Sequence, residues 1–180
     1  LVGSEMCKET DRGLYSLAST LTADGGQLTL NGRIDPEKQL YDAELRCDSL
    51  PLNRFLPADS LGALDFTLTA GGTGFDPLLP QARGSIRIRI GRAEYRGRNF
   101  GGIELDADLE NQHLSGRLSD HDEALRLLLL VSGTLTEKEQ RIGLSGNVFN
   151  FDLADMGITP EQIGGSFALD AAASVSDAGD

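Results

Sequence analysis

The sequence predicts an all-β protein: an elongated antiparallel sheet that curls around an apolar groove, with one or two short helical plugs. In "GSIRIRIG", residues 84–91, isoleucines fall on one side of an extended chain and arginines on the other. Gly, Asp and Asn turns separate many stretches of this kind. No long amphipathic helices are available to cover the apolar faces. These faces either pair as a closed sandwich or cover themselves by curling, and we favour curling.

Composition limits the classes of function. The chain has 180 residues, of which 22 are glycine, and a net charge of −12. Nucleic acid and anionic membrane surfaces repel such an acidic chain, so neither is expected as a partner. Tryptophan is absent and aromatic residues make up 6%, which disfavours a carbohydrate cleft. No apolar run approaches the roughly 20 residues that span a bilayer, so any membrane anchor is expected outside residues 1–180, one segment of a larger protein.

The first half of the chain is predicted to contain four strands. Residues 13–20 and 26–34 flank "ADGG", which is typical of a hairpin turn. Residues 40–50 alternate Tyr, Ala, Leu and Cys on one side with acids and Arg on the other. Residues 63–72 repeat the alternation with Leu, Phe, Leu and Ala. Each strand is therefore expected to have one apolar face and one polar face.

Two segments break this period and are predicted to be short helical plugs. Within 51–62, Leu52, Phe55 and Leu56 have the i, i+3, i+4 spacing of a helix and lie between two prolines. Residues 153–164 occupy the corresponding place in the second half. Both segments are expected to pack against the sheet at intervals.

The second half is predicted to contain further strands of the same kind. After a loop at "GTGFDPLLPQ", the sequence predicts strands in the ranges 84–97, 101–111, 112–120, 123–136, 140–151 and 165–175. The third and fourth of these form a hairpin whose tip is "LSDHDEAL", residues 118–125.

A weak internal repeat relates two parts of the chain. A shift of about 101 positions lays residues 26–71 over residues 127–173, with Gly32 on Gly133 and Phe66 on Phe167. Few letters are identical, but the order of strand, polar turn, strand, short apolar plug and strand occurs twice. A repeat of strands is typical of stacked units that bury their faces against one another.

Candidate sites of chemistry are weak. The acidic cluster at Asp120, His121, Asp122 and Glu123 is interpreted as a solvated hairpin tip, because consecutive side chains point apart on a strand. Paired acids such as those of "IELDADLE" belong to an ordinary solvent-exposed strand face. His113 lacks other ligands at zinc spacing, so no metal is expected. Neither a catalytic constellation nor a cofactor motif is found, so we expect no enzyme and no cofactor.

The two cysteines and one basic cluster are interpreted structurally. Cys7 and Cys47 are expected to be unpaired, partly buried thiols. Six arginines cluster on a chain that is otherwise acidic, and they either bind an acidic partner or pair with the neighbouring acidic strand "IELDADLE". Pairing is favoured because opposite charges across strands stabilise a sheet. The arginines are Arg83, Arg87, Arg89, Arg92, Arg96 and Arg98.

Two stretches resemble the repeating strands of the AsmA-like superfamily, and within it the TamB-type translocation and assembly module proteins in a version similar to that of Bacteroidetes. They are "QLTLNGRID…LYDAELRCDSLPLNRFLP…LGALDFTLTAGGTG" and "ARGSIRIRIGRAEYRGRNFGGIELDADLENQHLSGRLSDHDEALRLLLLVSGTL". The resemblance covers about residues 14–175. The matching positions are Gly32, Leu50, Leu52, Leu61, Gly62, Gly74, Ala93, Tyr95, Gly97, Ile103, Leu105, Gly116 and Gly133.

The resemblance implies a β-taco, a long curled sheet with an open-barrel-like apolar groove. It implies a periplasmic segment of a protein that spans the envelope of a Gram-negative bacterium, anchored in the inner membrane through segments outside this chain. It implies phospholipid transport between the membranes, support of outer-membrane biogenesis, and contact of other parts of the parent protein with an outer-membrane barrel protein.

We therefore expect a non-enzymatic conduit in which phospholipid acyl chains lie on the inward faces of the strands. The alternatives are a structural or chaperone module that offers its sheet edge to partner strands, and, less favoured, a solenoid enzyme acting on polysaccharide. The expected groove-lining residues are Leu28, Leu30, Ala43, Leu45, Leu64, Phe66, Leu68, Ile86, Ile88, Ile90, Ile103, Leu105, Leu127, Leu129, Val131, Phe167 and Leu169.

Overall fold

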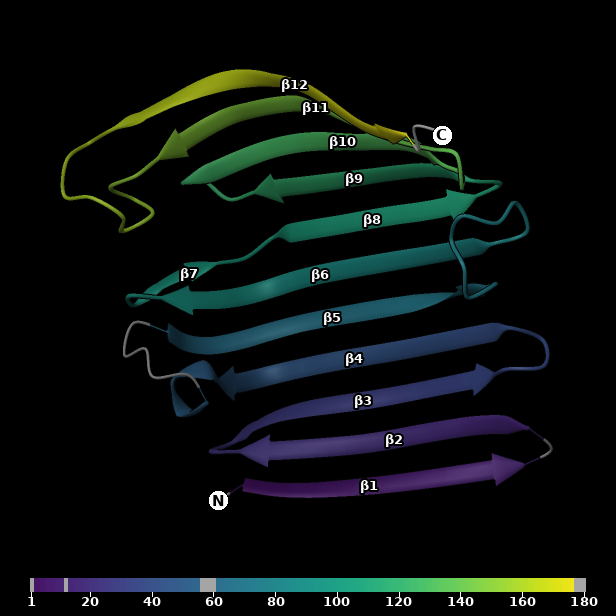
Figure 1. Cartoon of the computed structure of the whole chain (residues 1–180). Coiled ribbons are helices and arrows are strands. Elements are labelled where there is room, and N and C mark those ends of the chain that lie inside the picture. The colour runs from purple at the N-terminus through teal and green to yellow at the C-terminus, as the bar shows by residue number, and fades with distance from the viewer. Residues whose placement is uncertain (1, 12, 56–60, 177–180) are drawn as a thin grey trace.

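The protein is almost entirely β-structure in the computed structural model (Figure 1). The structure describes residues 2–11, 13–55 and 61–176, with the backbone alone for 2–11. One short 3₁₀ helix, η1, accompanies the strands. The elements are β1 (Val2–Asp11), β2 (Leu14–Ala23), β3 (Gly26–Asp35), β4 (Leu40–Pro51), η1 (Leu52–Arg54), β5 (Leu61–Thr73), β6 (Arg83–Tyr95), β7 (Arg98–Phe100), β8 (Ile103–Glu110), β9 (His113–His121), β10 (Leu125–Leu135), β11 (Glu139–Asp152) and β12 (Gly164–Ser176).

All strands belong to one antiparallel sheet in which neighbours in sequence are neighbours in space. The order is β1-β2-β3-β4-β5-β6-β8-β9-β10-β11-β12, and the short β7 pairs with β6 off this path. The sheet is open, with β1 and β12 at its edges, and it is visibly curved through β10–β12 (Figure 1). The predicted curled antiparallel sheet is thus confirmed, and the sandwich alternative is wrong because a second layer would need a second sheet.

Local sequence explains the up-and-down order. The β2–β3 turn has both central residues in the left-handed region, with Asp24 at φ 46° and Gly25 at φ 88°. This backbone twists in the same sense as the strands that it joins, and Asp-Gly adopts it readily. Short turns return several strands beside the previous one, and the longer loops 74–82 and 153–163 also join adjacent antiparallel strands, so no crossover is needed.

Three expectations are corrected. Residues 153–164 form turns instead of a helix: the Asp152 side chain accepts hydrogen bonds from the N–H groups of Ala154 and Asp155, and Gly157, at φ 71°, ends the single turn. The other plug is only the 3₁₀ turn η1, and its Leu56 lies outside the described residues. Strands β1 and β7 were not predicted, and the three residues of β7 are too few to carry an alternation signal.

The cluster of buried apolar side chains is small and lies in the N-terminal half. Ala23, Cys47 and Leu50 form one cluster, against which Leu28, Leu64 and Phe66 pack. The Cys47 thiol is 1% exposed and donates a hydrogen bond to the Leu64 carbonyl oxygen at 3.2 Å. Burial raises the pKa of this thiol, which is unpaired as predicted. The side chain of Cys7 lies outside the described residues.

Within the segments that the sequence aligns at a shift of 101, the strand pairs β4–β5 and β11–β12 share one register. Cys47 lies opposite Phe66 and Val148 opposite Phe167. A β-bulge then follows in each strand pair at the same place, so that Leu50 meets Leu64 and Phe151 meets Gly165. The pairs β4–β5 and β11–β12 are therefore copies of one geometry, including its irregularity.

Candidate functional site: the apolar face of the sheet

A continuous row of aliphatic side chains crosses the sheet at right angles to the strands. Residues that lie directly opposite each other on neighbouring strands share a face, with Cβ atoms about 5 Å apart. From β3 to β12 the strand register links one such set across every strand of the path. The row consists of Leu30, Leu45, Leu68, Ile88, Leu105, Leu118, Leu129, Gly146 and Leu169.

The register places all 17 expected lining residues on this face, which we call the apolar face. None of the 17 side chains is buried, and 15 are only half-buried. Ile86 and Phe167 are 44% and 52% exposed. Half-burial distinguishes the face from a closed core, in which most aliphatic side chains would be fully covered. Among the described residues, no second layer covers it.

A row of smaller side chains runs beside the leucine row and forms a shallow trough. Gly32, Ala43, Ala70, Ala107 and Gly116 belong to it, and the larger Ile86 interrupts it. A depression of ≈ 200 Å³ lies at Ala70, Ile86 and Ala107. The apolar face is therefore ridged and hollowed along the direction that crosses the strands.

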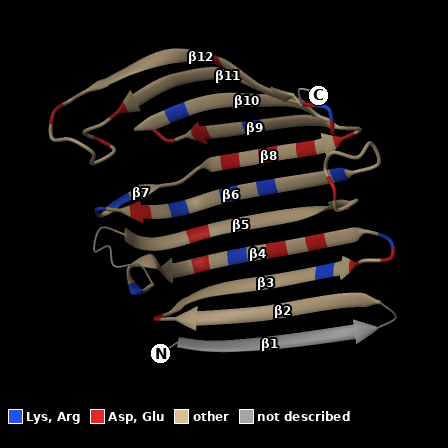
Figure 2. Ribbon diagram, viewed as in Figure 1, with Lys and Arg blue, Asp and Glu red and all other residues tan. Residues whose placement is uncertain are grey.

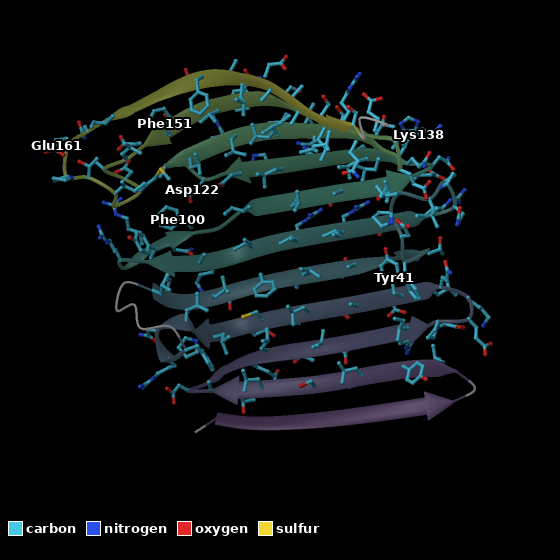
Figure 3. All side chains as sticks on the ribbon, viewed as in Figure 1. Tyr41, Phe100, Asp122, Lys138, Phe151 and Glu161 are labelled. Carbon is cyan, nitrogen blue, oxygen red and sulfur yellow. The ribbon has the colours of Figure 1, made fainter. Side chains whose placement is uncertain are left out.

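Tyr41 bounds this depression at one end of the strands. Two glycines, Gly72 and Gly84, make room for its ring: a methyl group added to either would lie within about 3 Å of the phenol oxygen. The ring also lies 6.3 Å from that of Phe75. Phe151 and Phe167, whose ring centroids lie 6.1 Å apart, form an aromatic pair at the other end of the strands. Figure 3 labels Tyr41 and Phe151 at these two ends. Aromatic rings thus flank the aliphatic rows.

The opposite face carries most of the charge in the middle of the sheet. Arg87 on β6 lies opposite Asp106 on β8. Its guanidinium also donates hydrogen bonds to both carboxylate oxygens of Asp108, each at 2.8 Å. Arg89 binds Asp106 at 2.8 and 3.0 Å and lies opposite Glu104. Figure 2 shows this ladder as blue bands on β6 beside red bands on β8. The predicted pairing with "IELDADLE" is confirmed for Arg87 and Arg89.

The remaining arginines of the cluster also have partners within the chain. Arg83 lies 3.5 Å from Glu110. Arg92 binds Asp65, and this hydrogen bond holds the pKa of the Asp65 carboxyl below its usual range. Arg96 and Arg98 donate hydrogen bonds to carbonyl oxygens of the β11–β12 loop. This distribution favours an internal role for the cluster over an acidic partner.

The predicted solvent exposure of one carboxyl group on the apolar face is wrong. Asp120 was predicted to be solvated, but it is 3% exposed and lies opposite Leu127 on the apolar side of β9. It accepts a hydrogen bond from the Asp122 N–H at 2.9 Å, and burial raises its pKa. The alternation Leu114, Gly116, Leu118, Asp120 could have revealed this, because strand β9 runs through Asp120 to His121, one residue beyond its expected end.

Comparisons with known proteins gave no match. It matches no protein-family model, and neither the curated proteins nor the solved structures contain a match. Within residues 13–55 and 61–176, no three His, Cys, Asp or Glu side chains converge to hold a metal ion. The described part of the chain has no helix that is long and apolar enough to cross a membrane.

Proposed function

We propose that this chain is a periplasmic segment of an AsmA-like, TamB-type envelope protein and that its apolar face carries phospholipid acyl chains between the inner and outer membranes. The single observation that supports this most directly is the uncovered apolar face, whose leucine row continues from β3 to β12. The proposed role is that of a conduit and involves no chemical step.

The size of the face suits an acyl chain. Neighbouring strands are about 4.8 Å apart, so the nine strands of the leucine row extend about 38 Å. The hydrocarbon core of a whole bilayer is about 30 Å thick, so one acyl chain spans about half of that. An acyl chain on the row therefore contacts apolar side chains along its entire length and can advance by small steps.

The energetics also favour this role. Each methylene group that leaves water contributes about 0.8 kcal/mol. The half-exposed rows offer such contacts without the cost of opening a packed core. The charged face can remain in water because its arginines and acids already pair with each other. Lipid headgroups would remain at the open mouth of the curled sheet.

Site-specific photocrosslinking in cells tests the proposal. A photoreactive residue at Ile88, in the leucine row, is expected to form lipid adducts. The same residue at Arg87, adjacent on the charged face, is the matched control and is expected to form few. Lipid adducts at 87 in place of 88 would contradict the proposal.

A blocking variant provides a second readout. Ile88→Asp places a carboxylate in the middle of the apolar row, where lipid passage would require its desolvation. We expect strong loss of co-purified phospholipid in native mass spectrometry, whereas Arg87→Gln retains it. Equal lipid content in both variants would contradict an acyl path over Ile88.

A further inference from the structure

The depression in the apolar face has the size of one segment of an acyl chain. Its volume is ≈ 200 Å³, and Ala70, Ile86 and Ala107 line it on β5, β6 and β8. Leu109 and Leu114 line the side toward the β8–β9 turn. A water molecule occupies about 30 Å³ in the liquid, and a methylene group is of similar size, so the depression has room for about six methylene groups.

The side chain of Tyr41 reaches this depression from β4 by crossing the neighbouring strand. Tyr41 lies opposite Gly72 on β5, and Gly72 lies opposite Gly84 on β6. A methyl group added at Gly72 would lie 2.6 Å from the phenol oxygen, and one added at Gly84 would lie 3.0 Å from it. The oxygen therefore lies over the two glycines, in a slot that a larger side chain at either position would fill.

The hydroxyl group of Tyr41 is a polar group at the rim of an apolar depression. It makes no hydrogen bond to the described residues, and its oxygen is accessible to solvent. A tyrosine hydroxyl that becomes covered by apolar groups normally finds a hydrogen-bond partner. Ligand pockets are typically apolar, with a few polar groups that fix the orientation of the ligand. The hydroxyl is thus placed to orient a ligand whose apolar part lies in the depression.

The loop that joins β5 to β6 closes the strand end behind Tyr41. The Gly74 N–H donates a hydrogen bond to the Gln39 carbonyl oxygen at 2.8 Å. On its other side, the Gln112 side chain donates a hydrogen bond to the Leu78 carbonyl oxygen. The loop is therefore held between the start of β4 and the β8–β9 turn (Figure 1). A long ligand in the depression extends away from this loop, over the rest of the apolar face.

The equivalent place in the pair β11–β12 lacks this slot. At the shift of 101, Tyr41 and Gly72 correspond to Ile142 and Ala173, which lie opposite each other. The strand pairing that the two regions share therefore requires neither a tyrosine nor a glycine at these positions. The hydroxyl over two glycines is a local feature of β4–β6, and a role in ligand binding accounts for it.

We propose that this depression binds the first methylene groups of an ester-linked acyl chain of a phospholipid and that the Tyr41 hydroxyl donates a hydrogen bond to the ester carbonyl oxygen. The rest of the chain continues over the leucine row. An ester carbonyl accepts hydrogen bonds and donates none, which suits a single hydroxyl donor. A free fatty acid offers a similar chain, but a net charge of −12 disfavours its carboxylate. This inference rests on the proposed function and adds to it the chemical group that is recognised.

Competition between ester and ether lipids tests the hydrogen bond. The probes are phosphatidylethanolamine with two ester-linked chains and its ether-linked analogue with the same headgroup and chain lengths, bound to the intact chain in native mass spectrometry. We expect the parent chain to prefer the ester lipid about three- to ten-fold, because the ether lacks the carbonyl oxygen. Tyr41→Phe is expected to abolish this preference by weakening ester binding alone. The matched control, Tyr95→Phe at the far end of β6, is expected to retain it.

The outcomes separate this site from the conduit as a whole. Equal binding of the two lipids by the parent chain, or equal loss of both in Tyr41→Phe, would overturn the proposed site and leave the conduit standing. Failure of every variant to bind either lipid would overturn the conduit and this site with it. A free fatty acid that displaces the ester lipid at equal concentration would overturn the assignment of the ester as the recognised group.

Infrared spectroscopy and a second variant give readouts that a role in packing would not move. A hydrogen bond lowers the stretching frequency of an ester carbonyl, so lipid labelled with carbon-13 at this group is expected to show a shifted band in the parent complex and not in Tyr41→Phe. Gly84→Val fills the slot, displaces the phenol oxygen and suits a strand, and it is expected to abolish the preference for ester over ether. An unshifted band in the parent complex, or an unchanged preference in Gly84→Val, would overturn the proposal.

Discussion

The strand triplets β3–β5 and β10–β12 share the register of their second strand pair, β4–β5 and β11–β12, but differ in burial. Cys47 and Val148 hold equivalent places and are 1% and 7% exposed. Their cross-strand partners diverge, because Phe66 packs against the buried cluster while Phe167 is 52% exposed. The reason is position in the sheet: β5 is covered on its far side by β6, and β12 is an edge. Strand pairing is thus a local property, whereas burial depends on what lies beyond the pair.

The largest expected effect is the difference in unfolding free energy between alanine substitutions at Phe66 and at the equivalent Phe167. Phe66→Ala removes a side chain that packs on the buried cluster and is expected to lower the free energy of unfolding by about 3 kcal/mol. Phe167→Ala at the equivalent position is expected to cost less than about 1 kcal/mol, since much of the ring already contacts water. Urea unfolding measures both. Equal losses would mean that burial at the two positions is the same in solution.

The next largest effect concerns how the free energy of unfolding depends on pH at Asp65 on β5 and at Asp120 on β9. Arg92 lowers the pKa of Asp65, so this group contributes stability above the pKa of the unfolded state, and that stability is lost as the pH falls through the lower folded value. Burial raises the pKa of Asp120, so its cost is absent at low pH and grows as the pH rises through the unfolded and then the folded value.

Asparagine substitutions at the two sites are therefore expected to act in opposite directions. Asp65→Asn is expected to destabilise the chain at neutral pH and to lose this effect in acid. Asp120→Asn is expected to compare most favourably with the parent chain at neutral pH. Unfolding free energies measured from about pH 3 to pH 7 test both, and parallel pH profiles for the two variants would contradict the assignment.

The smallest expected effect concerns the loop of the second triplet. Arg98 of β7 donates a hydrogen bond to the Asp155 carbonyl oxygen and so links residues 153–163 to strand β7. Arg98→Ala is expected to speed hydrogen exchange within this loop and to leave the global melting temperature nearly unchanged. The matched control is Arg54→Ala, which breaks the Arg54–Asp24 ion pair of the first triplet instead. Faster exchange throughout β8–β10 would show that the contact supports the sheet itself.

Sequence reasoning found most strands because each carries its own alternation. Ile86, Ile88 and Ile90 occupy one face with their predicted neighbours, and the six arginines found acidic or carbonyl partners. Residues 153–164 were wrong as a helix because apolar spacing does not report where side chains such as Asp152 bond to the backbone. Asp120 was missed because the end of a strand depends on its neighbour, and β10 extends the pairing to His121.

Local sequence sets the apolar side of most strands, many of the turns and the charges that meet across β6 and β8. These features depend on a period of two and on turn residues, both of which act within a few positions. The open sheet, the covered Cys47 beside the exposed Phe167, and the place of β12 at the edge follow from the tertiary structure alone. Those outcomes depend on how many strands stack and in what order, because burial requires atoms from distant parts of the chain.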